Sequence, residues 1–466
     1  MSLPLALLVL TRDPAGEVTG RKAVLATAAS SLEALGWRVE AAVVSRGPVP
    51  SRWEGRRVHH LRPPSLPPIL AGAARALLSG ARSLNEVLFD DRRVRAELAA
   101  TVADGGVDLV VADGLRTAAL AMMAGRPVVV HLDDLLSDRY DAMRAAPRTA
   151  AGGTEMLGFY AGQLPRSLRP PAAAAARRLL RREAAVVRRR EVAVARAAAA
   201  TAVTSPAEAA VLAGRAGVRV LAAPMAVDVD PRPSTAGAAP THSAVFLGWG
   251  GYAPNVAALR WWRDSVRPHL DAAGGAEVVL TVVGSYAAAQ QAELADDRLR
   301  FAGYVDDLAT ELRRHRVMVA PITAGAGLKT KVLDGMAQGL PVVATTLGVG
   351  GLTVTDGQDA WVADDPVAFA GHVLVACRDG VRAQEVGEAG RVLLAATWSH
   401  AALTARWAEL LAWALPGGPA AAVTRRAAGG RKADRRADGR SGPAFGLQGG
   451  CPCAEATGDT AHASGE

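Results

Sequence analysis

Two lysines beside a glycine-rich turn are the residues of this sequence that most clearly point to chemistry. Only four of the 53 basic residues are lysines, and two of them, Lys329 and Lys331, follow Gly325 and Gly327. Glycines let backbone N–H groups approach an anion closely, a helix N-terminus adds partial positive charge, and lysine ammonium groups attract phosphate. The segment therefore predicts a diphosphate site. The alternative is a tight strand-to-helix turn with solvent-facing lysines; a P-loop is excluded because Leu328 separates Gly327 from Lys329.

A second group of polar residues follows an apolar segment in the first half of the chain. The strand predicted over Pro127–Leu132 contains His131 and runs into Asp133 and Asp134. In a doubly wound sheet the carboxyl ends of the strands face the ligand crevice. His131, Asp133 and Asp134 are therefore candidates to orient an acceptor hydroxyl or accept its proton, with Arg139 to counter the acidic charge. The alternative is that these side chains cap the next helix.

The segment Ala320–Thr345 resembles the nucleotide-sugar site of the group 1, or family 4, retaining glycosyltransferases of GT-B fold. In that family a glycine-rich loop, a basic residue and an acidic residue precede Ala-Met-Ala-x-Gly-x-Pro-Val-Val-x-Thr, and here Asp334 precedes Gly-Met-Ala-Gln-Gly-Leu-Pro-Val-Val-Ala-Thr. Further segments resemble the exopolysaccharide-type branch of the family: Val245–Asn255, Trp261-Trp262, Phe301–Leu308 and Gly348–Leu352. The resemblance covers Ala244–Ala376 well and the first half of the chain only thinly.

The resemblance implies a role for each lysine and for the acidic residue. Lys329 and Lys331 would neutralise the leaving diphosphate, and Asp334 would form a hydrogen bond with the donor ribose. The donor-binding residues that the resemblance implies are Gly325, Gly327, Leu328, Lys329, Lys331, Asp334, Tyr304, Val305, Gly350 and Gly351. Of the usual pair of glutamates the first is missing, because Thr323 and Ala324 stand there, and the second is the shorter Asp334.

Two weaker patterns concern the acceptor and a metal. Gly16 and Gly20 resemble the glycine-containing acceptor and phosphate loop of the family. Asp228 and Asp230 form an Asp-x-Asp pair, the metal–nucleotide signature of the other main glycosyltransferase fold. Because this pair lies in a proline-rich segment, we predict no metal site, and we expect no cofactor beyond the nucleotide-sugar substrate.

The resemblance implies a retaining, metal-independent transfer of a sugar from a nucleotide-diphosphate-sugar to a hydroxyl of a carbohydrate or lipid-linked acceptor. Synthesis of a cell-surface polysaccharide or glycolipid is the expected setting. Two alternatives stay open. The first alternative is a catalytically silent GT-B scaffold or regulatory partner, which the missing glutamate favours. The second is a nucleotide-sugar epimerase, which would act without an acceptor.

Apolar strands alternate with helical patterns along both halves, which predicts parallel sheets covered by helices on both faces. The expected fold is α/β, a GT-B architecture of two doubly wound Rossmann-like domains that face a cleft. We expect an acceptor-side domain over 1–225, a linker over 226–243, a nucleotide-sugar domain over 244–397, a helix over 398–415 that crosses back to the first domain, and a disordered tail over 416–466. Single helices are predicted over Asn255–Leu270 and Ser399–Leu415, and no strand is placed between Pro48 and Ala100.

The net charge of +8 is concentrated in one segment. Arg166–Arg196 holds ten arginines against Glu183 and Glu191, so the rest of the chain sums to zero. A uniformly basic surface for nucleic acid is therefore not expected, and no aromatic residues are interleaved with these arginines. The segment predicts a helix whose Arg178, Arg182, Arg188 and Arg189 face an anionic membrane surface. The alternative is a solvated helix packed by one apolar stripe.

Composition sets the remaining limits. Half of the residues are hydrophobic and 21% are charged, so the chain can bury a large core. No run of about 18 uncharged apolar residues predicts a membrane span. Three cysteines, Cys377, Cys451 and Cys453, exclude a disulfide scaffold and a four-cysteine zinc site. We expect a cytoplasmic protein that lies on the inner face of the membrane when bound there.

Overall fold

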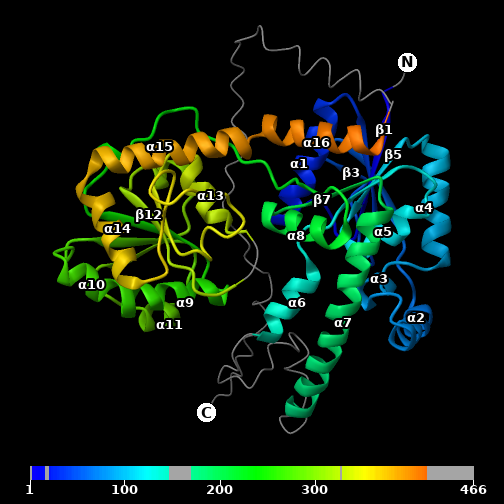
Figure 1. The fold of residues 1–466 in the computed structure, drawn as a ribbon, viewed down its shortest axis with the longest axis horizontal. Helices are drawn as coiled ribbons and strands as arrows, with labels where there is room; N and C mark the ends of the chain where they lie inside the picture. The colour runs from blue at the N-terminus through cyan, green and yellow to red at the C-terminus, as the bar shows by residue number, and fades with distance from the viewer. Residues whose placement is uncertain (1–2, 16–19, 146–168, 326–327, 417–466) are drawn as a thin grey trace, which may run out of the picture.

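The chain forms two lobes, each built on one sheet (Figure 1). The computed structural model describes residues 3–15, 20–145, 169–325 and 328–416. The predicted α/β fold with two doubly wound domains is confirmed. The tail predicted over 416–466 lies outside the described residues from 417 onward.

The sheet of the first domain has the order β3-β4-β2-β1-β5-β6-β7-β8, and its strands run parallel except β3, which pairs antiparallel with β4. The strands are β1 (Leu5–Leu10), β2 (Arg38–Val44), β3 (Arg52–Trp53), β4 (Arg56–Leu61), β5 (Leu109–Asp113), β6 (Val128–His131), β7 (Ala200–Val203) and β8 (Leu221–Ala222). The apolar run of β1 is buried along its whole length, as a central parallel strand requires. Strands β3 and β4 were not predicted from the sequence, because β4 reads Arg-Arg-Val-His-His-Leu and buries only Val58 and Leu61.

Helices cover both faces of this first sheet. The helices are α1 (Gly20–Ala34), α2 (Leu66–Ser79), α3 (Leu84–Val87), α4 (Arg92–Gly105), α5 (Leu115–Met122), α6 (Leu136–Ala145), α7 (Arg169–Ala197), α8 (Pro206–Ala216) and α16 (His400–Ala414). Buried side chains of α1 and α16 form the core on one face, and those of α4, α5, α7 and α8 form the core on the other.

The second domain has a parallel sheet of order β11-β10-β9-β12-β13-β14. Its strands are β9 (Ser243–Leu247), β10 (Val279–Val283), β11 (Leu299–Gly303), β12 (Val317–Ala320), β13 (Val342–Ala344) and β14 (Trp361–Val362). Its helices are α9 (Ala253–Trp261), α10 (Arg267–Ala272), α11 (Ala288–Glu293), α12 (Leu308–Leu312), α13 (Thr330–Ala337), α14 (Pro366–Arg378) and α15 (Gly380–Thr397). The helix predicted over Asn255–Leu270 is interrupted by a π-helical turn, Trp262–Val266, just before Pro268. A π turn is one way in which a helix accommodates a residue that cannot donate a backbone hydrogen bond.

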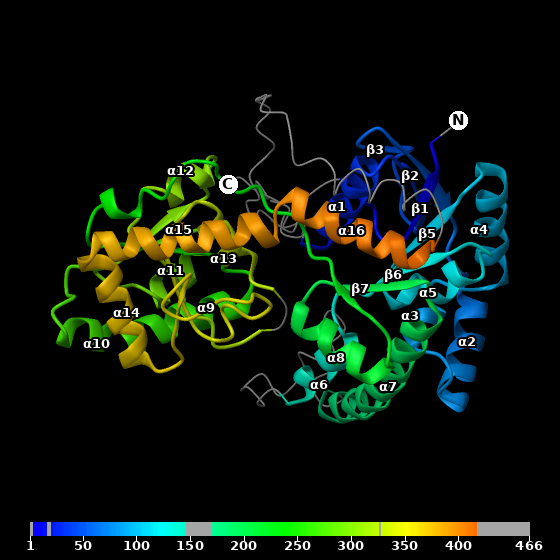
Figure 2. The same cartoon turned by 45° about the horizontal axis from the view of Figure 1, so that its top comes forward.

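Helices α15 and α16 run end to end along one side of the molecule and join the two lobes (Figure 2). Trp407 of α16 is buried against the first sheet. The segment between β8 and β9 also connects the two lobes. It lies next to the junction of α15 and α16, because the backbone N–H of Val227 donates to the carbonyl of Trp398 at 2.8 Å. The two lobes are therefore connected at one place, where both crossings are tied together.

Candidate active site

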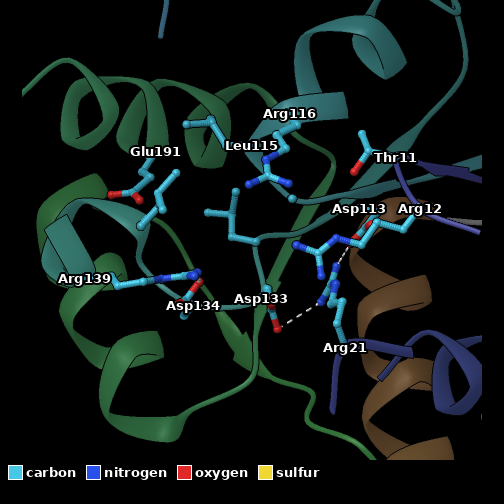
Figure 3. A pocket seen from close by; sticks show the side chains of 13 residues that line it. Thr11, Arg12, Arg21, Asp113, Leu115, Arg116, Asp133, Asp134, Arg139 and Glu191 are labelled. Carbon is cyan, nitrogen blue, oxygen red and sulfur yellow. Dashed lines mark hydrogen bonds and ion pairs between the residues drawn. The ribbon is translucent and has the colours of Figure 1, made fainter. Parts of the chain in front are cut away.

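The first candidate site lies where the strand order of the first sheet reverses. β1 is central, and the chain continues from it to β2 on one side and from β5 to β6 on the other. Ligands of open α/β sheets bind outside the carboxyl ends of the strands at such a point. A hollow of about 150 Å³ lies there (Figure 3), lined among others by Arg12, Arg21, Asp113, Arg116, Asp133 and Arg139. One of its walls is α6, which lies on the side of the first domain turned toward the second (Figure 1).

Arg21 forms ion pairs and a hydrogen bond with three residues beside this hollow. It lies in the first turn of α1, and its guanidinium forms an ion pair with Asp113 at the end of β5. The same guanidinium lies 3.2 Å from a carboxylate oxygen of Asp133 and donates to Nδ1 of His131 at 3.1 Å. The side chains of Arg21 and Asp113 are only 9% and 7% exposed. One buried cation thus links the ends of α1, β5 and β6.

His131 is engaged at both ring nitrogens. Its Nε2 lies 2.7 Å from the carbonyl oxygen of Ala223, which can only accept, so Nε2 carries the proton. Nδ1 then accepts from Arg21 and, at 3.2 Å, from the backbone N–H of Asp133. Burial, and then the charge of Arg21, lowers the pKa of His131 to about 4. The ring stacks on Trp407 with a centroid distance of 6.5 Å. Both ring nitrogens of His131 thus have partners within the protein, and its expected part in orienting the acceptor hydroxyl or accepting its proton stays a prediction.

Asp133 and Asp134 lie differently from each other. Asp133 has a left-handed backbone (φ +69°), and its side chain is 37% exposed toward the hollow (Figure 3). Its carbonyl accepts hydrogen bonds from the N–H and hydroxyl of Thr204, which hold this backbone in place. Asp134 forms an ion pair with Arg139, the pairing partner expected from the sequence. Neither carboxylate caps the next helix by a described hydrogen bond, and both line the hollow, together with Asp113 and Glu191.

The second candidate site lies at the equivalent point of the second sheet. The order reverses between β9 and β12, and the helix after β12 is α13. Lys331, in the first turn of α13, donates from Nζ to Oδ1 of Asn255 at 2.5 Å and lies 4.4 Å above the ring centroid of Phe246. It is 5% exposed, and burial lowers its pKa to about 7. The alternative of solvent-facing lysines is wrong, since Lys329 is also only 7% exposed.

The remaining residues of α13 complete this site. Asp334 lies one turn after Lys331 and is buried, and burial raises its pKa well above the usual range. Its Oδ2 has no hydrogen-bond partner among the described residues. Burial also lowers the pKa of Lys329, the residue that precedes α13. The start of α13 thus combines two buried ammonium groups with a buried carboxyl group that has an unused acceptor.

Glycines bring the loops of the second domain together at this edge. Gly325 has a φ of +102°, and a Cβ there would lie 2.9 Å from the hydroxyl of Tyr252 in the turn after β9. A Cβ on Gly351, in the turn after β13, would lie 3.1 Å from Leu328. The turns after β9, β12 and β13 are therefore in contact, and they lie on the side of this domain that is turned toward the first domain (Figure 1).

The remaining residues expected at the donor site lie in different places. Gly350 belongs to the same turn as Gly351. Tyr304 and Val305 lie apart from this turn, because they follow β11 at the far edge of the sheet. Tyr304 is half-exposed, and Val305 packs partly against the core. Gly327 lies outside the described residues.

Residues 243–379 match the family model described as Glycosyl transferases group 1. The matched residues, which make up most of the second domain, are similar to a group 1 glycosyl transferase domain. Over 129 residues, or 26% of this chain, the sequence is 28% identical to an uncharacterized 44.6 kDa protein in the cps region of Klebsiella pneumoniae. That match covers 33% of the relative, so the chain spans about a third of the length of the curated relative it matches.

Solved structures resemble the whole two-domain chain. Sucrose-phosphate synthase from Thermosynechococcus elongatus superposes with a TM-score of 0.56 at 18% identity and covers 89% of this chain and 100% of its own. Anabaena HepE in complex with UDP and glucose gives 0.53 at 14% identity, with coverages of 87% and 99%. TarM gives 0.57 at 9% identity, with coverages of 87% and 98%. At these identities the likeness shows the fold, and the predicted GT-B architecture is confirmed.

Three arginines outside the group 1 domain were missed from sequence. Arg12, Arg21 and Arg116 line the hollow of the first domain. Arg21 contacts Asp113 and His131, which lie 92 and 110 positions further along the chain. The one available signal was position, because Arg12 follows β1 and Asp113 ends β5 at the reversal point. The expected loop residue Gly20 begins α1, and a Cβ there would meet no atom within 4 Å. Gly16 lies outside the described residues.

No group of three or more potential metal ligands occurs among the described residues. Asp228 forms an ion pair with His400, and Asp230 forms ion pairs with Arg232 and Arg313. Both carboxylates of the Asp-x-Asp pair therefore have structural partners next to the group 1 domain.

The expected membrane-facing arginines lie on α7 in the first domain, apart from the group 1 domain. Arg178 and Arg182 are exposed. Arg188 forms ion pairs with Asp138 and Asp141, and Arg189 donates to the carbonyl of Gly80 at 3.4 Å. Within the described residues, no helix has the length and apolar character needed to cross a membrane.

Proposed function

We propose that the protein is a retaining, metal-independent glycosyltransferase that moves a sugar from a nucleotide-diphosphate-sugar to a hydroxyl acceptor. The observation that carries the proposal is the placement of Lys329 and Lys331 at the start of α13, at the reversal point of a group 1 domain. A buried ammonium group is costly unless a negative charge comes to it, and a diphosphate supplies that charge.

The donor would lie against the second domain. Lys331 and Lys329 would stabilise the negative charge that develops on the leaving diphosphate, and Asn255 holds the Lys331 ammonium in place. A ribose hydroxyl is a group that would satisfy the unpartnered Oδ2 of Asp334. Binding of donor and acceptor at facing edges would supply most of the catalysis by positioning.

The acceptor would lie against the first domain. Asp133 faces the hollow and would orient the attacking hydroxyl, while Arg21 and His131 fix the position of Asp133. The alternative of a silent partner predicts nucleotide binding without turnover, and the epimerase alternative predicts turnover without acceptor.

Nucleotide binding to the second domain is the first expected result. One of UDP, GDP, ADP and dTDP, at 100 times its dissociation constant, should raise Tm by about 2–4 °C, since saturation at that level stabilises by about 2.7 kcal/mol. UDP is tried first, because it is bound in the HepE structure. Differential scanning fluorimetry checks this.

The control is the Lys329→Ala/Lys331→Ala double variant, which should fold but show no shift. A well-folded wild type with no shift for any nucleotide would contradict the donor site. A shift followed by no sugar transfer to any acceptor would favour the silent partner.

The proposal places the enzyme in cell-surface polysaccharide or glycolipid synthesis, at an anionic membrane surface on the cytoplasmic side. The cps-region relative supports this setting. A second support is α2, whose one buried residue is Ala76 and whose one charged residue is Arg75. Leu66, Leu70 and Leu78 are 62%, 60% and 87% exposed, which is rare for a soluble surface.

Basic residues flank this apolar helix. The carbonyl of Gly80, which ends α2, accepts from Arg189 of α7. Arg178, Arg181 and Arg182 of α7 are exposed. An apolar helix beside exposed arginines complements a bilayer with anionic headgroups.

Replacing Leu70 and Leu78 by glutamate should reduce binding to phosphatidylglycerol-containing vesicles by at least about tenfold, because each buried leucine contributes about 1.5–3 kcal/mol. Vesicle co-sedimentation checks this, with pure phosphatidylcholine as the uncharged surface. The matched control is Val381→Glu, an exposed valine of the second domain that should bind as wild type. Unchanged vesicle binding by the leucine variants, or a wild-type dimer that these variants dissociate, would contradict membrane docking.

A further inference from the structure

The exposed aromatic side chains of the described residues gather at the carboxyl edge of the second domain's sheet. Trp249, Tyr252 and Tyr304 are 37%, 44% and 53% exposed, and all three lie in turns that follow strands of this sheet. The other tryptophans of the chain are buried or pack partly against a core, whereas Trp249 belongs to no core cluster of the described residues. Aromatic rings contribute large contact areas to ligand sites, so their position at this edge indicates contact with a ligand.

The indole ring of Trp249 lies against the backbone of Gly251. A Cβ on Gly251 would overlap the six-membered part of this ring, so the ring can occupy its position only because residue 251 is a glycine. The exposed part of the ring remains available to a ligand. Gly251 therefore fixes where the ring of Trp249 is presented.

The turn that carries Trp249 is tied to the start of α13. The backbone N–H of Gly250 donates to the carbonyl of Ser285 at 2.9 Å. The carbonyl of Trp249 accepts from Nδ2 of Asn255 at 2.8 Å, and Oδ1 of the same Asn255 accepts from Nζ of Lys331. One asparagine thus joins the backbone of Trp249 to an ammonium group that the proposed function assigns to the donor diphosphate.

The position of Trp249 fits the sugar end of the donor. Helix α13 begins at the carboxyl edge of the sheet and runs away from it, as the crossover helix between two parallel strands does. Asp334, the proposed contact of the ribose, is therefore one turn farther from this edge than Lys331. Trp249 lies in a turn at the edge itself. With the diphosphate at Lys331 and the ribose toward Asp334, the sugar at the other end of the diphosphate would reach the turn of Trp249.

We propose that Trp249 is a specificity-determining residue of the donor site and that its ring stacks on the sugar of the nucleotide-sugar. The inference rests on the proposed function, because it needs the donor diphosphate at Lys331. The C–H groups on one face of a pyranose are apolar, and they complement the apolar, partly negative face of an indole. The contact selects a pyranose that has C–H groups over one face, such as glucose or galactose.

The test measures the affinity of free nucleotide and of nucleotide-sugar by calorimetry. The probes are the nucleoside diphosphate that raises Tm and its glucose, galactose and N-acetylglucosamine esters. Trp249→Ala should raise Kd of the tightest ester at least about threefold, since one aromatic stacking contact corresponds to about 2- to 12-fold in affinity. Kd of the free nucleotide should change less than twofold, because Asn255 binds the backbone carbonyl of residue 249 and not its side chain.

Two further variants test the ring itself. Trp249→Phe keeps an aromatic ring and should recover most of the affinity for the ester. Gly251→Ala keeps the tryptophan but displaces its ring, so it should weaken ester binding as Trp249→Ala does. The matched control is Gly371→Ala on α14, where a Cβ would meet no atom within 4 Å and both ligands should bind as to wild type. An unchanged Tm shift with the free nucleotide shows that each variant is folded.

Three outcomes would overturn this inference alone. Equal losses for free nucleotide and ester in Trp249→Ala would show that the ring contacts the nucleoside or supports the turn. Unchanged binding of the esters would show that no sugar touches the ring, and wild-type ester binding by Gly251→Ala would show that the ring does not act from its position over Gly251. Failure of the proposed function is a separate result, seen with wild type alone: no nucleotide or ester would raise Tm, and the inference would fall with it.

Discussion

Replacing Lys331 by methionine is expected to lower kcat/KM for sugar transfer by about 10²- to 10³-fold, the usual cost of removing one fixed group that stabilises transition-state charge. Methionine keeps the side-chain length and the contact with Phe246, but it removes the hydrogen bond with Asn255 and the positive charge. Initial rates of nucleotide release with donor and acceptor measure the effect. A loss of less than threefold would show that Lys331 is a structural lysine.

The pH dependence of donor affinity distinguishes charge stabilisation from structure. Burial lowers the pKa of Lys331 to about 7, and a bound diphosphate would raise it, because it stabilises the charged form. Donor binding then takes up a proton above pH 7, so affinity should fall by up to about tenfold per pH unit there and stay level below pH 7. Lys331→Arg should remove this slope because arginine stays charged. A wild type whose donor affinity is level from pH 6 to pH 9 would contradict the contact.

The fold could be predicted wherever the sequence pattern is local. The apolar run of β1, the serine before α8 and the proline that begins α8 needed no tertiary information. Helix α15 is not among the helices predicted from the sequence, and it contains glycines, which have low helix propensity. A Cβ on Gly387 would lie 2.1 Å from the carbonyl oxygen of Gly339, so close packing on the turn after α13 requires glycine there. Tertiary contact overrides helix propensity at this position.

The donor site was easier to predict than the acceptor site for a physical reason. Gly325, Lys329, Lys331 and Asp334 lie within ten positions of one another on a single turn and helix. The acceptor-side hollow instead depends on Arg21, whose partners lie on other strands. No spacing rule links residues that meet only when a sheet forms, so Arg21 and its role in fixing His131 became visible only in the structure.

Replacing Arg21 by methionine is expected to destabilise the first domain by about 3–5 kcal/mol, because it leaves the buried carboxylate of Asp113 without its cation. Urea unfolding followed by circular dichroism measures this. The matched control is Arg93→Met, which removes an exposed ion pair with Glu97 and should cost less than about 1 kcal/mol. Equal effects of the two substitutions would show that the Arg21 pair is no stronger than a surface pair.

The Arg21→Met/Asp113→Asn double variant separates stability from positioning. Removing both charges relieves the unpaired carboxylate, so the double variant should recover part of the lost stability, and its ΔΔG should be smaller than the sum of the two single values. Activity should not recover, because Asp133 and His131 have still lost the guanidinium that holds them. Recovery of activity together with stability would show that Arg21 serves the fold alone. Recovery of stability without activity would show that this buried cation positions the acid that faces the acceptor.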